Sequence, residues 1–169
     1  MPDSTLSQAL KEAYAAAPAD VVIYHTLELD HANFPSPIYV VNDYADLNAT
    51  LEDATPVTFI RFAFRFNRPE VTPNGVPAMT VEIDNVSREI LANVQLAMTS
   101  TSLITMTYRQ YLSTDLSGPQ NDPPLTMVLS NIKADVFKVT ATATFGDYAN
   151  KRFPNREYTA EDFPGLVVA

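Results

Sequence analysis

The sequence predicts a mainly β protein, a β-sandwich or barrel with a flanking N-terminal α-helix and a second short helix. Several short segments alternate apolar and polar residues, which is the pattern of a strand with one buried face. Turn residues separate these segments at regular spacing. Thirteen prolines stand against four glycines in 169 residues, and proline is confined to loops and strand edges. Residues 1–145 are expected to form one domain, since a chain of this length typically builds a single core.

The first expected element is a helix, with Ser4 or Thr5 placed to cap its N-terminus. Its apolar face has helical spacing and comprises Leu6, Leu10, Ala13, Tyr14 and Ala17. Pro18 should end the helix, because the residue before a proline avoids α geometry.

Residues 21–31 and 38–42 are predicted to form a long antiparallel hairpin, joined by a loop that contains two prolines. In the first strand one face takes Val21, Ile23, His25, Leu27 and Leu29, and the other takes Tyr24, Thr26 and Glu28. Residues 44–55 are polar and acidic, and we expect an exposed connection with at most a short turn of helix.

The clearest predicted strand covers residues 57–67, with the sequence VTFIRFAFRFN. Its unbroken alternation predicts one continuous strand. One face takes Ile60, Phe62, Phe64 and Phe66, and the other mostly takes Phe59, Arg61, Ala63 and Arg65.

Four more strands are predicted, and Ser87 is placed to cap the second helix. The strands cover residues 78–83, 103–112, 125–130 and 135–145, and the helix covers residues 87–98. In the last strand the apolar face takes Phe137, Val139, Ala141, Ala143 and Phe145. Residues 113–124 are expected to form a long loop.

Residues 146–169 have a different composition, rich in aromatic residues, prolines and charges. We expect an extended segment that packs either on its own domain or on a neighbouring subunit. Its aromatic side chains, Tyr148, Phe153, Tyr158 and Phe163, are candidate anchors on a partner.

The overall composition argues against several classes of function. The net charge is −9 and the 11 lysines and arginines do not cluster, so we expect no direct nucleic-acid binding. The absence of cysteine excludes disulfides and thiolate chemistry. No apolar run approaches the length of a membrane span, and no signal peptide is expected.

A search for catalytic motifs is equally negative. The isolated glycines form no nucleophile elbow, Walker loop or dinucleotide-binding fingerprint. His25 is interpreted as a core or interface histidine, and His31 beside Asp30 as part of a loop. The many carboxylates read as a solvated acidic rim. We therefore predict no catalytic residue, no metal ligand and no cofactor, and we do not expect an enzyme.

Three segments together resemble a known phage family. They are ALKEAYAAAPADVVIYHTLELDH at 9–31, PIYVVNDYADL at 37–47 and VPAMTVEIDNVSREI at 76–90. The family is catalogued as a domain of unknown function and is found in tail gene clusters of long-tailed, siphovirus-like phages. The resemblance covers roughly residues 6–145, and it departs from the family at Asn42, where a basic residue is common.

The resemblance implies a structural virion protein of the tail tip, assembled in the host cytoplasm. By analogy with distal tail proteins it implies a ring subunit, expected to be hexameric, that joins the tail tube to the baseplate hub. The implied partners are further copies of the chain, the tail tube protein, and the hub and tape measure proteins. The alternatives are a host-recognition or carbohydrate-binding module of the tail tip and, third, a small cell-wall hydrolase.

The candidate ring contacts are strand edges and exposed side chains. Besides the four aromatic residues of the C-terminal segment, the candidates are Tyr24, Glu28, Arg61 and Arg65. Arg61 and Arg65 either pair with acidic residues of an adjacent subunit or are simply solvated.

Overall fold

The computed structural model describes residues 5–66, 78–84, 102–135 and 137–145, together with Asn93, Ala97 and Ser100. Within these residues the chain forms one helix and nine strands. They are α1 (Gln8–Ala16), β1 (Ile23–Asp30), β2 (Ile38–Val41), β3 (Leu47–Thr50), β4 (Pro56–Arg61), β5 (Phe64–Phe66), β6 (Ala78–Asp84), β7 (Ile104–Leu112), β8 (Leu125–Ala134) and β9 (Lys138–Thr144).

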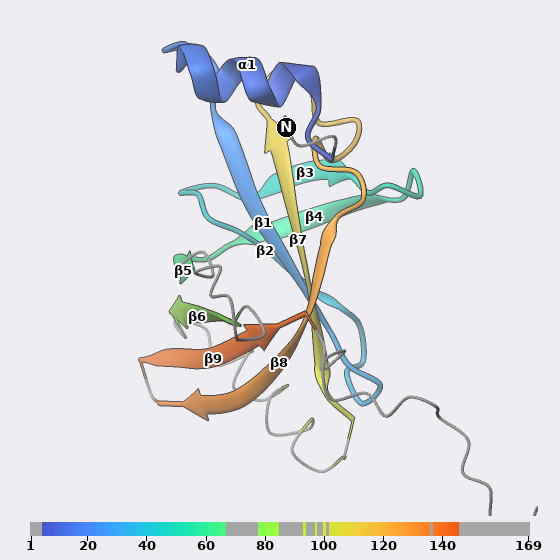
Figure 1. The fold of residues 1–169 in the computed structure, drawn as a ribbon. Helices are drawn as coiled ribbons and strands as arrows, with labels where there is room; N and C mark the ends of the chain where they lie inside the picture. The colour runs from blue at the N-terminus through green and yellow to red at the C-terminus, as the bar shows by residue number, and fades with distance from the viewer. Residues whose placement is uncertain are drawn as a thin grey trace, which may run out of the picture.

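All nine strands belong to one sheet, in the order β3-β4-β2-β1-β7-β8-β9-β6-β5. Neighbouring strands are antiparallel except β2 and β4, which are parallel. The long strands β1 and β7 run the length of the molecule, and α1 lies across one end of them (Figure 1). The mainly β fold with a flanking N-terminal helix is therefore confirmed, but the described strands form one open nine-stranded sheet and not the predicted β-sandwich or barrel.

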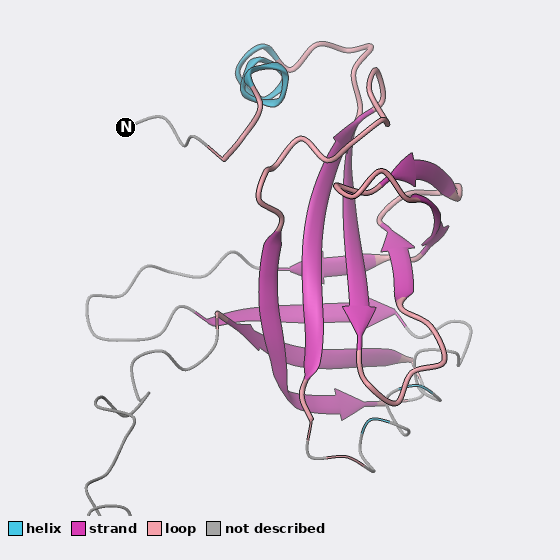
Figure 2. Ribbon diagram, turned by 90° about the vertical axis from the view of Figure 1, so that its right-hand side faces the viewer, coloured by secondary structure: helices cyan, strands magenta, loops and turns pink. Residues whose placement is uncertain are grey.

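The sheet is strongly bent, so that strands in its lower half cross β1 and β7 at a steep angle (Figure 2). Its two ends are joined by the chain itself, because only Phe62 and Ala63 separate β4 from β5. The Phe62 amide donates to the Val41 carbonyl at 2.9 Å, and the Asp84 amide donates to the Ala63 carbonyl at 2.9 Å. The bend therefore leads the chain from β4, next to one edge of the sheet, directly to β5 at the opposite edge.

The core is divided into three clusters of buried side chains. The largest lies within the bent sheet and includes Leu27, Val40, Met106, Met127 and Ala143. The second lies beneath β3 and β4 and consists of Val41, Leu47, Ala49, Leu51, Phe59 and Tyr111. The third joins Leu10 and Ala13 of α1 to Leu112 of β7.

The helix begins later than the sequence predicts. Ser7, rather than Ser4 or Thr5, is the N-cap, and its Oγ accepts a hydrogen bond from the Leu10 amide at 3.1 Å. The same hydroxyl donates to Gln120 Oε1 at 2.7 Å, which gives Ser7 a tertiary partner that no local pattern reveals. The helix ends at Ala16, before Pro18 as predicted, with Ala17 in the left-handed region at φ 43°.

The prediction of one continuous strand at 57–67 is wrong, and so is part of the prediction of which side chains are buried. The bend at Phe62 and Ala63 divides it into β4 and β5. In β4, Phe59 is fully buried in the second cluster and Ile60 is 39% exposed, the opposite of the prediction. Alternation cannot reveal a bend that moves a strand from one cluster to another.

Two other predictions are wrong, and a third falls mostly outside the described residues. Residues 44–55 contain β3 and are not merely an exposed connection. Phe137, predicted to face inward, is 79% exposed because it lies in the turn between β8 and β9. Most of the predicted helix at 87–98 and all of residues 146–169 lie outside the described residues, although Asn93 and Ala97 are helical.

Candidate functional site

The predicted contact residues do not form one cluster. Tyr24 is half-buried and packs against the second core cluster. Glu28 lies on the same face of β1, whereas Arg61 at the end of β4 and Arg65 in β5 are exposed. The other four candidates, Tyr148, Phe153, Tyr158 and Phe163, lie outside the described residues.

Glu28 takes part in an ion-pair network that the sequence does not predict. Arg109 of β7 is only 4% exposed, and its Nη1 lies 2.6 Å from Glu28 Oε2. Its Nε and Nη2 donate to the two carboxylate oxygens of Glu52 at 2.7 and 2.8 Å. The network joins β1, β7 and the turn after β3, so Glu28 is occupied within its own chain.

The network changes the acid–base properties of its members. The hydrogen bonds from Arg109 lower the pKa of Glu52 below its ordinary value. Burial disfavours the charged guanidinium of Arg109, but the hydrogen bonds to Glu52 and Glu28 outweigh it and raise its pKa. Burial also raises the pKa of the Tyr111 hydroxyl. Arg109 and Glu52 thus form a bidentate, charge-assisted ion pair.

An exposed surface on β3 and β4 surrounds Arg61. The surface, which we call the β3–β4 surface, consists of Tyr44, Asp46, Asn48, Ile60 and Arg61. Tyr44 is 95% exposed. Arg61 Nη1 donates to the Tyr44 carbonyl at 3.2 Å, and the Arg61 amide donates to Asp46 Oδ1 at 2.9 Å. These bonds fix the loop that presents the Tyr44 ring.

The β3–β4 surface includes the outer edge of β3, which is the first strand in the sheet order. The Thr50 amide points away from β4, since it donates to the Leu116 carbonyl at 3.0 Å. Backbone groups two residues apart in a strand point the same way. The amide and carbonyl of Asn48 therefore face the same way as those of Thr50. The Thr50 amide and carbonyl are already bonded within the chain to Leu116 and Tyr111, so of these two residues only Asn48 can offer its backbone groups to a strand of another chain.

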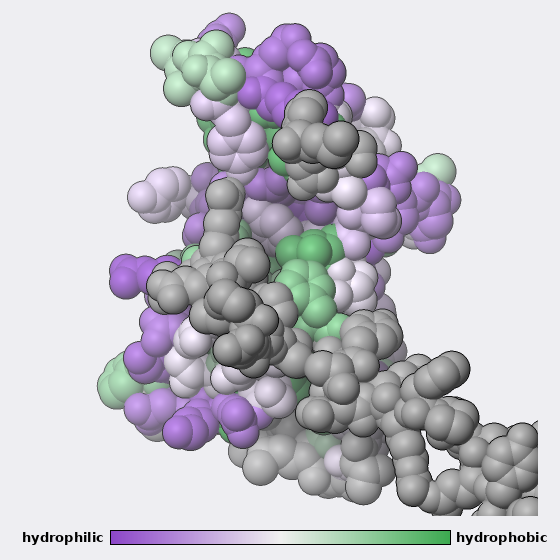
Figure 3. All heavy atoms as spheres, in the orientation of Figure 1, coloured by the Kyte–Doolittle hydropathy of each residue, from purple (hydrophilic) through white to green (hydrophobic). Residues whose placement is uncertain are grey.

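A groove of about 480 Å³ lies between α1 and the sheet. We call it the helix groove, and the apolar residues on this face below α1 are visible in Figure 3. Those of its lining residues that the structure describes are all uncharged: Thr5, Leu6, Tyr14, Leu27, Phe66, Met79, Tyr108, Gln110, Asn121, Pro123, Pro124 and Leu125. An uncharged groove in a chain of net charge −9 is suited to an apolar or aromatic occupant rather than to an ion.

Hydrogen bonds between side chains stiffen the wall of the helix groove. Gln110 Nε2 donates to the Tyr14 hydroxyl at 2.6 Å, which ties α1 to β7. His25 Nδ1 and the Tyr108 hydroxyl lie 2.6 Å apart, and their rings stack with centroids 6.0 Å apart. His25 is thus half-buried behind the groove, in keeping with its interpretation as a core or interface histidine.

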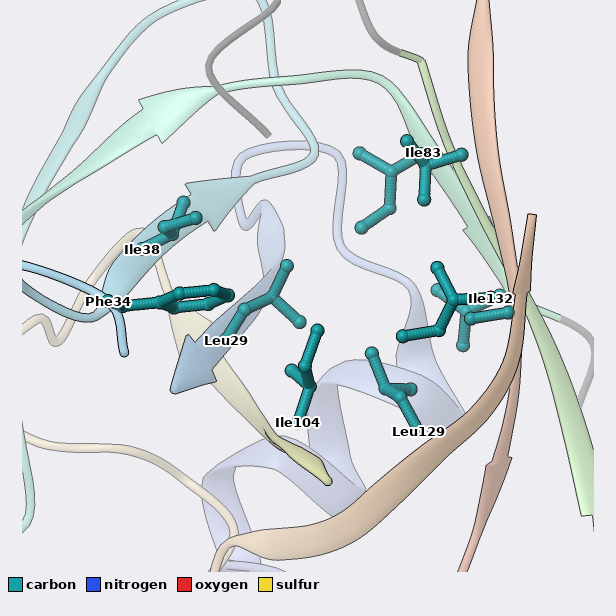
Figure 4. A pocket seen from close by; sticks show the side chains of 10 residues that line it. Leu29, Phe34, Ile38, Ile83, Ile104, Leu129 and Ile132 are labelled. Carbon is teal, nitrogen blue, oxygen red and sulfur yellow. The ribbon is translucent and has the colours of Figure 1, made fainter. Parts of the chain in front are cut away.

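A second hollow lies inside the sheet and is part of the core (Figure 4). Its volume is about 20 Å³, and its ten lining side chains are all apolar, among them Leu29, Phe34, Ile83 and Leu129. A space of this size is only about large enough for one water molecule. We interpret it as a packing void.

Two further features are absent from the described residues. No group of three histidine, aspartate or glutamate side chains there is close enough to hold a metal ion. No described helix is long and apolar enough to cross a membrane.

The fold and these surfaces define a small, mainly β protein with one flanking helix, an exposed strand edge and an uncharged groove. The chain belongs to the family described as a domain of unknown function (DUF1833), which matches residues 9–158. The expected resemblance to a family of unknown function is confirmed. No curated protein matches the chain.

Proposed function

We propose that this protein is a structural subunit of a bacteriophage tail tip, and that it forms a ring joining the tail tube to the baseplate hub. The proposal starts from the resemblance of the chain to a family encoded in phage tail gene clusters. It assigns the protein a role in assembly rather than in catalysis. The expected partners are neighbouring copies of the chain, the tail tube protein, and the hub and tape measure proteins.

The observation that carries the proposal is the β3–β4 surface. Tyr44 is 95% exposed, and aromatic side chains are enriched in protein interfaces relative to the rest of the surface. Ile60 lies on the same surface and is 39% exposed, with the Arg61 guanidinium close by. Tyrosine and arginine are the residues most often found at the centre of protein interfaces.

A ring requires a heterologous contact, in which one patch meets a different patch of the next subunit. The β3–β4 surface can serve as one half, because the outward-facing backbone of Asn48 can accept a neighbouring strand while Tyr44 packs beside it. Pairing would also cover an edge that otherwise invites aggregation. Arg61 and Arg65 are exposed on separate strands, and only Arg61 belongs to this contact.

Substitutions at two positions of the β3–β4 surface test the proposal. Tyr44→Ser should remove the exposed ring, and Asn48→Pro should remove an outward donor while leaving the β3–β4 hydrogen bonds intact. The matched controls are Phe137→Ser, at another exposed aromatic, and Asn48→Ala, which keeps the amide.

The measurement is the oligomer mass by native mass spectrometry. Tyr44→Ser and Asn48→Pro should each reduce the fraction of assembled rings at least about tenfold, equivalent to about 1.4 kcal/mol, and the controls should assemble like the wild type. Equal assembly of all four variants would remove this surface from the contact. A wild-type protein that never assembles, alone or with tail proteins, would instead favour a monomeric host-recognition module.

A further inference from the structure

We propose that the helix groove is the docking site of the chain's own C-terminal segment, residues 146–169. This inference concerns the subunit itself and does not depend on the ring function. It combines the place where the chain leaves the sheet, the chemistry of the groove and the composition of the segment.

The described chain ends beside the groove. Thr144, the last residue of β9, lies opposite Ala78 of β6 and Val128 of β8. Met79 follows Ala78 in β6, and Leu125 is the first residue of β8, the strand that contains Val128. Met79 and Leu125 both line the groove. Residues 146–169 therefore start next to the groove mouth. With 24 residues at about 3.3 Å each when extended, the segment can traverse the groove.

The groove offers aromatic and apolar surface without charge. Tyr14, Phe66 and Tyr108 supply rings, and Pro123 and Pro124 lie at its border. Leu125 is 37% exposed although it is a large aliphatic residue at the start of a strand. Such a surface favours a partner that brings aromatic rings and proline, which pack well on aromatic walls and lose little conformational entropy.

The C-terminal segment has this composition. It contains two Phe-Pro pairs ten residues apart, Phe153-Pro154 and Phe163-Pro164, besides Tyr148 and Tyr158. Because the segment is attached at the groove mouth, its local concentration there is far above that of any free peptide, on the order of millimolar. Both arguments favour the chain's own segment as the occupant.

Residues 67–77 are a competing occupant of the groove. They connect Phe66 of β5 to Ala78 of β6, and Phe66 and Met79 both line the groove. That segment contains no aromatic residue. A groove with aromatic walls accommodates it less well than it accommodates the Phe-Pro pairs.

Cross-linking in the full-length protein tests the proposal, because the chain has no native cysteine. The test variant carries Leu125→Cys at the groove and Asn155→Cys beside Phe153-Pro154. The matched control carries Phe137→Cys and Asn155→Cys. Position 137 is more exposed than position 125 and also lies on the β8–β9 hairpin, so random collision would favour the control.

The readout is the rate of intrachain disulfide formation under mild oxidation, followed by mass spectrometry without reductant. The test pair should form its disulfide at least about tenfold faster than the control pair, reflecting the higher effective concentration of a docked segment. Adding Phe153→Ala and Phe163→Ala to the test pair should remove this difference.

Equal rates in the two pairs would overturn the docking. A disulfide-linked dimer as the main product of the test pair would also overturn it, because the groove would then hold a neighbour's segment. Hydrogen exchange of residues 125–127 in the full-length protein gives an independent check without cysteines. Exchange there should accelerate in the Phe153→Ala, Phe163→Ala variant, and unchanged exchange would count against the proposal. The oligomer mass of the same samples is measured separately. Loss of the ring with the intrachain disulfide retained would contradict only the ring proposal, and loss of the disulfide with the ring retained would contradict only the docking.

Discussion

At the scale of single residues, Arg109 stands out as a buried charge. Its guanidinium is almost fully buried, and it is satisfied by two carboxylates from segments that are distant in sequence, Glu28 and Glu52. A buried charge is tolerated only when it is paired and hydrogen-bonded. Arg109 therefore fixes the turn after β3 to the long strands, and with it the position of the β3–β4 surface.

Arg109→Ala should lower the free energy of unfolding by about 3 kcal/mol, because it leaves Glu28 without its charged partner and opens a cavity. Lys138→Ala is the matched control, since it removes an exposed ion pair with Glu82 at 3.3 Å. Such a pair contributes under about 1 kcal/mol. Urea denaturation of both variants measures the difference, and equal losses would show that the buried network has no special role.

The same network predicts a pH dependence. The pKa of Glu52 is lower in the folded protein than its ordinary value of 4.5, so the folded state favours the ionised carboxylate. The resulting stability is present in full above pH 4.5 and is lost as the pH falls through the lower folded pKa. The stability difference between wild type and Glu52→Gln should therefore shrink as the pH falls below 4.5 in urea titrations. A difference that stays constant over this range would contradict the assignment.

At the scale of elements, the bend between β4 and β5 decides the architecture. It allows one segment of chain to pair with β2 at one end and with β6 at the other. The side chains change clusters at the same point, because Phe59 packs in the second cluster and Phe64 in the first. A straight strand would place Phe59 on the outside.

At Phe59 and Ile60, the structure and the alternation of the sequence predict opposite burial of the side chains. Because Phe59 is fully buried and Ile60 is 39% exposed, Phe59→Ala should cost about 3–5 kcal/mol. Ile60→Ala should cost under about 1 kcal/mol. Thermal or urea unfolding of the two variants measures both values. A larger loss at Ile60 than at Phe59 would restore the continuous strand and contradict the bend.

Much of the fold was predictable because β1, β6, β7 and β9 each alternate over enough residues to show their buried face. β3 was missed because its sequence, LNAT, is short and lies within an acidic stretch. The candidate site was harder to predict. The Arg109 network joins residues 57 and 81 positions apart, and no local pattern encodes such a contact. The one available signal was the Arg109-Gln110 pair, because the other residues of this strand are apolar, aromatic or threonine.

At the scale of the whole molecule, the described residues present two separate surfaces for the proposed contacts. The edge of β3 at Asn48, with Tyr44, is suited to another strand, and the helix groove is suited to an aromatic segment. In the two proposals together, each subunit accepts a neighbour at one surface while its own C-terminal segment occupies the other. In the proposed ring, the net charge of −9 would keep the subunit in solution before assembly and would repel DNA from the wall of the conduit.

The most direct test of the ring assignment is the mass and symmetry of the wild-type protein, by native mass spectrometry and electron microscopy, together with its location in purified virions. We expect a closed ring of six copies between the tail tube and the tip. The β3–β4 surface should lie at the contact between neighbouring subunits. A protein that is monomeric and absent from virions, or present only on peripheral fibres, would contradict it.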